Sequence, residues 1–97
     1  METKEFFEDE LIIIKLHGEP LNWKFITIED VSDTSKVWFG RIDSIKSIAI
    51  SNNMLKINIL GANEPLSLTV SPIDEELRYK LKTIFNRLKS LMIESSI

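Results

Sequence analysis

The segment SPIDEELRYKLKTIFNRLKSLMI, residues 71–93, decides the fold because its apolar residues recur at helical spacing along its whole length. Such a pattern predicts an amphipathic helix that buries one face. We expect Leu81 and Leu88, near the centre of the apolar stripe, to be fully buried against strands. The stripe consists of Ile73, Leu77, Leu81, Ile84, Phe85, Leu88, Leu91 and Met92.

The start of this helix is also indicated by the sequence. Ser71 suits the capping position, and Pro72 suits the first helical position, where no N–H is needed. Asp74 completes a spacing similar to a capping box, and the acidic residues that follow it favour the positive end of the helix dipole. We therefore predict a helix over residues 73–93.

The residues before the helix predict about six short β-strands, because β-branched and apolar residues alternate there between turn formers. The predicted strands are residues 11–16, 21–31, 36–42, 45–50, 54–60 and 66–70. Asn52 and Asn53 predict a tight hairpin turn, since asparagine tolerates positive φ angles. The acidic residues 1–10 fit a mobile arm, a short helix or an extra strand.

The hairpin predicted over residues 21–42 carries large apolar residues on both faces. Trp23 and Phe25 share one side, while Ile26 and Ile28 take the other, which indicates either a bulge near residues 25–26 or two covered faces. In the strand predicted over residues 36–42, Trp38 points to one face, and Val37 and Phe39 point to the other. A closed barrel would bury both faces, whereas an open sheet would leave one of them for a partner.

Together these elements predict an α+β, mainly β fold. About six antiparallel strands form a bent sheet or partly open barrel, which the C-terminal helix closes. The 97 residues are enough for one domain with one core, spanning residues 1–97.

Composition excludes several classes of function. Without cysteine the chain has no disulfide, thiolate metal site or thiol nucleophile, and its net charge of −3 gives no general attraction to nucleic acid or anionic lipid. No apolar run is long enough to insert into a membrane, and the acidic start does not resemble a signal peptide, so we expect a cytoplasmic protein. Abundant isoleucine, lysine and asparagine favour an AT-rich genome, such as a low-GC bacterium or its phage.

Catalytic and cofactor motifs are not recognisable. His17 is the single histidine, and no spacing of acidic residues around it predicts a metal site or a catalytic triad. The three glycines stand apart and form no phosphate loop. We expect no cofactor and no enzyme activity. One alternative is a small-ligand binder or enzyme whose site in a barrel mouth includes His17, Asp43 and Tyr79; another is a nucleic-acid-binding sheet that uses the lysines on the strands.

The segment GRIDSIKSI at residues 40–48 is followed by a strand, the hairpin motif NNMLKI at residues 52–57, another strand and the closing helix. This order of motifs from residue 39 to residue 93 resembles bacterial PH-like domains. The resemblance implies a protein-recognition module that binds along an exposed strand or in the groove beside the helix. Phosphoinositide binding is not expected, since the loop at residues 17–20 lacks the basic residues of lipid-binding members.

The sequence thus predicts a non-enzymatic protein-interaction module, such as a small bacterial or phage regulator or inhibitor that acts by surface recognition or self-association. The candidate interaction residues are Trp23, Trp38, Phe39 and Arg41. If this hairpin binds a partner, at least one of the two indoles should be substantially exposed.

Overall fold

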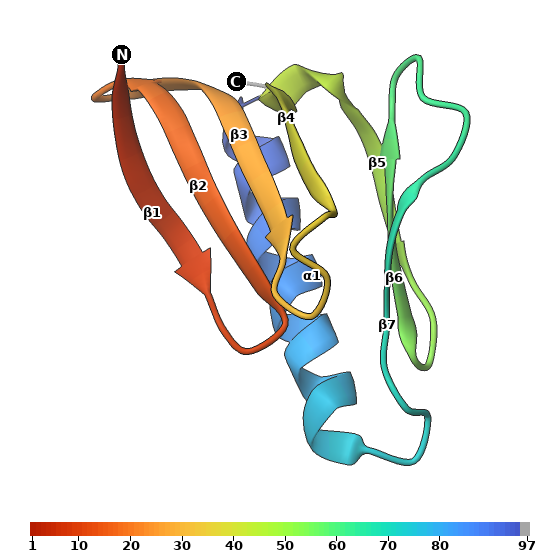
Figure 1. The fold of residues 1–97 in the computed structure, drawn as a ribbon. Helices are drawn as coiled ribbons and strands as arrows, with labels where there is room; N and C mark the ends of the chain where they lie inside the picture. Colours follow the sequence, from red (N-terminus) through yellow and green to blue (C-terminus); the bar gives the residue numbers. More distant parts are fainter. Residues whose placement is uncertain (96–97) are drawn as a thin grey trace. The chain divides into compact units, whose positions relative to one another are not determined.

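The computed structural model describes residues 1–95, which contain seven antiparallel strands and one C-terminal helix (Figure 1). The elements are β1 (Glu2–Glu8), β2 (Ile12–Glu19), β3 (Asn22–Asp30), β4 (Val37–Arg41), β5 (Ile45–Ile50), β6 (Met54–Ile59), β7 (Leu66–Thr69) and α1 (Glu75–Ser95), with a 3-10 turn at Ile42–Ser44. The mainly β prediction is confirmed. The described residues contain seven strands where about six are predicted, and the strands form two sheets, in the orders β1-β2-β3-β4 and β5-β6-β7. The chain divides into two compact units at residue 42.

Strand β1 accounts for the difference in strand count. It pairs antiparallel with β2, placing Glu5 opposite Lys15 and Phe7 opposite Ile14, with a register shift between Glu5 and Phe7. Opposite charges on paired strands stabilise a sheet, and a bulge with charged residues protects an outer strand from unwanted pairing. The extra strand is therefore the correct one of the three alternatives for residues 1–10.

The first sheet buries one face along its two central strands. Ile14 lies opposite Ile28, and Leu16 lies opposite Ile26. The buried side chains on this face are those of Ile12, Ile14, Leu16, Ile26 and Ile28. Because strand residues alternate between faces, the residues between these isoleucines and leucines point to the opposite side of the sheet.

A bulge near the turn of the β2–β3 hairpin determines which residues of β3 point to the buried face. His17 pairs with Phe25 and Gly18 pairs with Trp23, so Lys24 has no partner on β2. Of the two alternatives for the change of phase, a bulge is the one observed, at Lys24 instead of residues 25–26. Gly18 adopts a φ of +148°, and a Cβ atom there would lie 2.8 Å from the Asn22 carbonyl oxygen, so only glycine fits.

The same hairpin ends in a strained turn. Glu19 pairs with Asn22, which leaves Pro20 and Leu21 as a two-residue loop. Leu21 has a φ of +69° and a fully exposed side chain. Turns with proline first favour glycine or asparagine second, since a Cβ atom is disfavoured at positive φ.

Two aspartates organise the predicted turn between β3 and β4. The Asp30 carboxylate accepts hydrogen bonds from the amide and hydroxyl of Ser32, and Asp33 accepts the same pair from Ser35. The hydroxyl and then the amide of Ser35 lower the pKa of Asp33. The preference of aspartate and serine for turns is realised here through these local bonds.

The second unit contains the three-strand meander that the sequence predicts. The Ser51 amide donates to the Met54 carbonyl across a two-residue turn at Asn52 and Asn53. The expected reason for this turn is wrong, because Leu21 is the single non-glycine residue with positive φ within residues 1–95. The two asparagines act through their side chains instead. Asn53 donates to the Val70 carbonyl at 3.1 Å, and Asn52 accepts from a helix residue.

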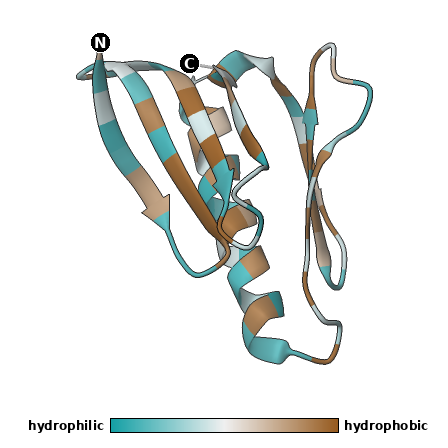
Figure 2. Ribbon diagram, viewed as in Figure 1, coloured by the Kyte–Doolittle hydropathy of each residue, from teal (hydrophilic) through white to brown (hydrophobic). Residues whose placement is uncertain are grey.

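Helix α1 packs on β5 and β6 of its own unit. Leu81 and Leu88 are 0% exposed, as predicted, and Ile84 and Leu91 complete the buried stripe. Figure 2 shows hydrophobic and hydrophilic stretches following one another along the helix.

The helix begins later than predicted. Its first residue is Glu75, and the Leu77 amide donates to the Asp74 carboxylate at 3.0 Å, so Asp74 rather than Ser71 is the cap. Ser71 instead accepts a backbone bond from Asp74, and Ile73 lies outside the helix with 89% of its surface exposed. Aspartate and serine cap helices about equally well, so composition alone does not choose between them.

Leu88→Ala and Leu81→Ala should each lower the free energy of unfolding by about 2–5 kcal/mol, because each removes a fully buried side chain and leaves a cavity. Chemical denaturation followed by circular dichroism measures this loss. Lys89→Ala, at an exposed position on the same helix, is the control and should change stability little. A loss below about 1 kcal/mol for both leucine variants would show that the helix is peripheral to the core.

Leu21→Gly should raise the free energy of unfolding by up to about 1 kcal/mol, since it removes the Cβ clash at positive φ but adds chain entropy to the unfolded state. Leu21→Ala keeps the Cβ atom and should leave stability nearly unchanged. Equal stabilisation by both variants, measured by thermal unfolding, would assign the effect to the exposed side chain instead of to the backbone.

Candidate functional site

The outer face of the first sheet carries a group of aromatic and apolar side chains. Register places Phe25 opposite Arg41, Thr27 opposite Phe39 and Glu29 opposite Val37, all on the face that points away from the buried isoleucines. We call His17, Phe25, Val37 and Phe39 the aromatic surface. Val37 and Phe39 are 50% and 56% exposed, although both are apolar.

The rings of this surface are in contact with one another. Phe25 and Phe39 stack with their centroids 5.7 Å apart and their planes 8° apart. The imidazole of His17 meets Phe39 edge-on at 5.5 Å. Both arrangements are favourable geometries for aromatic pairs, so each ring limits the motion of the next.

Two threonines fix the orientation of His17. Its Nδ1 atom is hydrogen-bonded to the Thr3 hydroxyl at 2.9 Å, and its Nε2 atom to the Thr27 hydroxyl at 2.6 Å. These bonds join β1, β2 and β3 across the outer face. Because both ring nitrogens bond hydroxyls, the arrangement lacks the carboxylate that orients a catalytic histidine. His17 here supports its aromatic neighbours.

The predicted interaction residues lie on different faces. Phe39 and Arg41 share the outer face, whereas Trp38 lies opposite Ile28 on the other face. The indole of Trp38 lies over Gly40, where a Cβ atom would come within 2.5 Å of the ring. Trp23 pairs with Gly18 and is half-buried, as is Trp38. Neither indole is substantially exposed, so the tryptophans do not supply the exposed group expected of a binding hairpin, and the exposed ring on this hairpin is that of Phe39 instead.

Phe25 and His17 were not predicted as site residues. Their spacing along the chain carries no signal, because the contact with Phe39 depends on the register of β2, β3 and β4. The one relevant signal in the sequence was the change of phase near residue 25, which indicates that Phe25 and Ile26 point to opposite faces.

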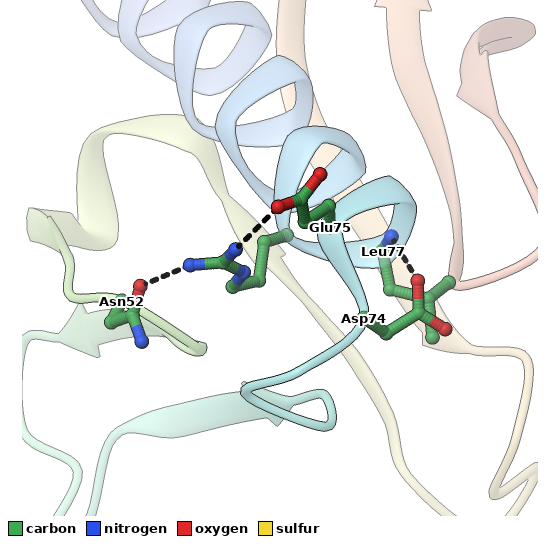
Figure 3. A network of polar contacts seen from close by, with 5 residues as sticks. Asn52, Asp74, Glu75 and Leu77 are labelled. Carbon is green, nitrogen blue, oxygen red and sulfur yellow. Dashed lines mark hydrogen bonds and ion pairs between the residues drawn. The ribbon is translucent and has the colours of Figure 1, made fainter.

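A second candidate site lies in the other unit, beside the first half of α1. A groove of about 570 Å³ is lined by Ile50, Ser51, Asn52, Glu75, Arg78, Tyr79 and Lys82. We call it the helix groove. The Arg78 Nη1 atom donates to the Asn52 side-chain oxygen at 2.7 Å, and its Nη2 atom lies 4.0 Å from Glu75 (Figure 3). This bond ties the β5–β6 turn to the helix.

The residues of the enzyme alternative are not gathered into one described groove. Tyr79 lines the helix groove, and neither this groove nor a smaller one of about 300 Å³ near Lys46 and Asn58 is lined by His17. Within residues 1–95, no three histidine or acidic side chains converge where they would hold a metal ion. In the same part of the chain, no helix is long and apolar enough to cross a membrane.

Comparison of the sequence with models of known protein families gave no match, and a search of curated proteins found no similar sequence. The aromatic surface and the helix groove are therefore the basis for any inference about function.

Gly40→Ala should displace the Trp38 indole, because the added Cβ atom would overlap the ring. We expect a changed Trp38 fluorescence spectrum and a loss of about 1–3 kcal/mol in the free energy of unfolding, as for other overpacked positions. The measurement uses a Trp23→Phe background, so that Trp38 is the single fluorophore of its kind. An unchanged spectrum with unchanged stability would contradict this placement of the indole.

Proposed function

We propose that the chain is a non-enzymatic protein-interaction module that recognises a partner protein through the aromatic surface. The observation that carries this proposal is Phe39, which is 56% exposed although its ring contacts both Phe25 and His17. Rings that are already ordered lose little conformational entropy on binding, so their apolar area contributes more fully to affinity. Aromatic residues dominate the energetics of many interfaces for this reason.

The surroundings of the rings suit a protein partner. Arg41 lies on the same face, and arginine is enriched with aromatic residues at protein interfaces. Glu29 lies beside Val37, and Glu5 lies opposite Lys15, so both signs of charge border the apolar centre. An apolar centre with a mixed polar rim is the usual arrangement of a protein interface.

Nucleic acid is the competing partner class, since exposed rings on a sheet also stack on unpaired bases. Glu5 and Glu29 offset the charges of Lys15 and Arg41 on the same face, and the net charge of −3 gives the chain no general attraction to a phosphate backbone. This balance favours a protein. The enzyme alternative has less support, because both ring nitrogens of His17 are bonded to threonine hydroxyls.

The proposal includes the PH-like resemblance of residues 39–93 and a role as a small bacterial or phage regulator or inhibitor. Seven antiparallel strands and a C-terminal helix are compatible with that resemblance. Members of this group recognise other proteins by their surfaces, which agrees with the proposed use of the aromatic surface.

Phe39→Ala should weaken partner binding by about 10- to 100-fold, the usual cost of removing an aromatic hot spot, while changing stability much less because the ring is mostly exposed. The test compares the proteins retained from the source organism's lysate by immobilised wild-type and variant chains, and then measures each affinity with the purified partner. Leu60→Ala removes an exposed apolar side chain of the other unit, outside the helix groove, and is the matched control.

The same proteins retained with the same affinity by wild type and Phe39→Ala would contradict the proposal. Sedimentation velocity distinguishes the self-association alternative. If the wild-type chain dimerises and Phe39→Ala does not, the aromatic surface binds a second copy of the chain instead of a different protein.

A further inference from the structure

We propose that the helix groove is a second binding site, which takes a short extended peptide segment with an acidic side chain next to an apolar one. The site lies entirely within the second unit and shares no residue with the aromatic surface. It can therefore be tested independently of the proposed function.

The position of Arg78 gives the first reason. Its guanidinium is fixed by the 2.7 Å bond to Asn52, but its contact with Glu75 at 4.0 Å is too long for a hydrogen bond. The Nε atom of Arg78 is buried without a hydrogen-bond partner among the described residues. A guanidinium has five N–H donors, so Arg78 is held in place with donors on Nη2 still available to a carboxylate.

Lys82 gives the second reason. It is exposed, lines the same groove one helical turn after Arg78, and forms no ion pair with another residue in the described part of the chain. Lys80 on the same helix, by contrast, pairs with Glu76 at 3.4 Å. Two cations against the single carboxylate of Glu75 make the groove locally positive in a chain of net charge −3.

The apolar lining gives the third reason. Tyr79 is 71% exposed and Ile50 is half-buried, and both line the groove beside the cations. A tyrosine offers a flat apolar face together with a hydroxyl, which suits contact with a peptide side chain and backbone. The groove therefore combines charge complementarity for a carboxylate with a surface for an adjoining apolar group.

The shape and charge of the groove favour a peptide over other anions. Its volume of about 570 Å³ is comparable to that of ligand sites, but the groove is open and would not enclose a small molecule. The Glu75 carboxylate, which is mostly exposed at the groove, repels a phosphate dianion more strongly than a single carboxylate. A peptide segment with an acidic side chain next to an apolar one can lie in an open groove, and it brings only a single negative charge close to Glu75.

The test titrates the ¹⁵N-labelled full chain with an array of capped octapeptides. Each peptide places leucine or phenylalanine next to aspartate, and matched peptides carry asparagine or lysine at the acidic position. We expect aspartate peptides to shift the amide signals of Ser51, Asn52 and Tyr79 with Kd values below about 1 mM. The asparagine peptides should bind about three- to tenfold more weakly, and added salt should reduce the difference.

Variants identify the residues that bind. Lys82→Gln should raise the Kd of an aspartate peptide about three- to tenfold, and Arg78→Gln should raise it at least tenfold, because a fixed guanidinium makes charge-assisted hydrogen bonds. Lys89→Gln removes an exposed positive charge outside the groove and should leave the Kd unchanged. Because Arg78→Gln also breaks the bond to Asn52, its fold is checked by the ¹⁵N spectrum, and Lys82→Gln alone is sufficient to decide.

Three results would overturn the proposal: no aspartate peptide shifts these amides at 1 mM, asparagine peptides bind equally well, or Lys82→Gln and Lys89→Gln have the same effect. Inorganic phosphate is tested in parallel. If phosphate shifts the same amides and no peptide does, the groove binds simple anions only and the proposal fails. Peptide binding that persists in Phe39→Ala would separate this site from the proposed function, since either can fail without the other.

Discussion

The register of the β2–β3 hairpin is the constraint on which the first sheet depends. Side chains alternate between the faces of a strand, so a shift of one residue exchanges the buried and exposed sets. The bulge at Lys24 shifts the register of β3 by one residue. As a result, Ile26 lies on the buried face with Ile14 and Leu16. Without it, β3 would bury the wrong alternate residues. The requirement for glycine at position 18 follows, because the chains approach too closely there for a Cβ atom.

The aromatic surface is a consequence of the same bulge. Once Ile26 points inward, Phe25 points outward beside His17, and β4 brings Phe39 onto the two rings. Thr3 and Thr27 then hold the imidazole from the strands on either side. Hydrophobic burial on one face thus determines which rings meet on the other. The rings on this face pack against one another, since Phe39 contacts both Phe25 and His17.

Much of the fold could be predicted from the sequence, while the site could be predicted only in part. Strand β5 was predicted with its correct bounds, because β-branched residues and flanking turn formers are local signals. The sequence does not choose between a strand, a helix and a mobile arm for residues 1–10, because the charged residues of β1 have little β-propensity without β2 as a partner. The local sequence pattern predicts Phe39 as an interaction residue. Phe25 and His17 join it on the aromatic surface only through the pairing of β2, β3 and β4, which the local pattern does not reveal. In the structure, the alternation that turns Trp38 to the buried face turns Arg41 to the face of Phe39. Its use in binding stays a prediction.

The two surfaces differ in what maintains them. The aromatic surface depends on strand register, which is a property of the whole sheet, whereas the helix groove depends on local contacts at the start of α1. Asp74 caps the helix there, and Asn52 holds Arg78 against the β5–β6 turn. These polar groups are partly accessible to water. Rearranging the side chains of the helix groove therefore costs less free energy than rearranging the packed rings of the aromatic surface. A surface with fixed rings favours one partner shape, while a groove with charged side chains tolerates several related segments. Under the two proposals, the aromatic surface would select its partner by shape and the helix groove would select its peptide by charge.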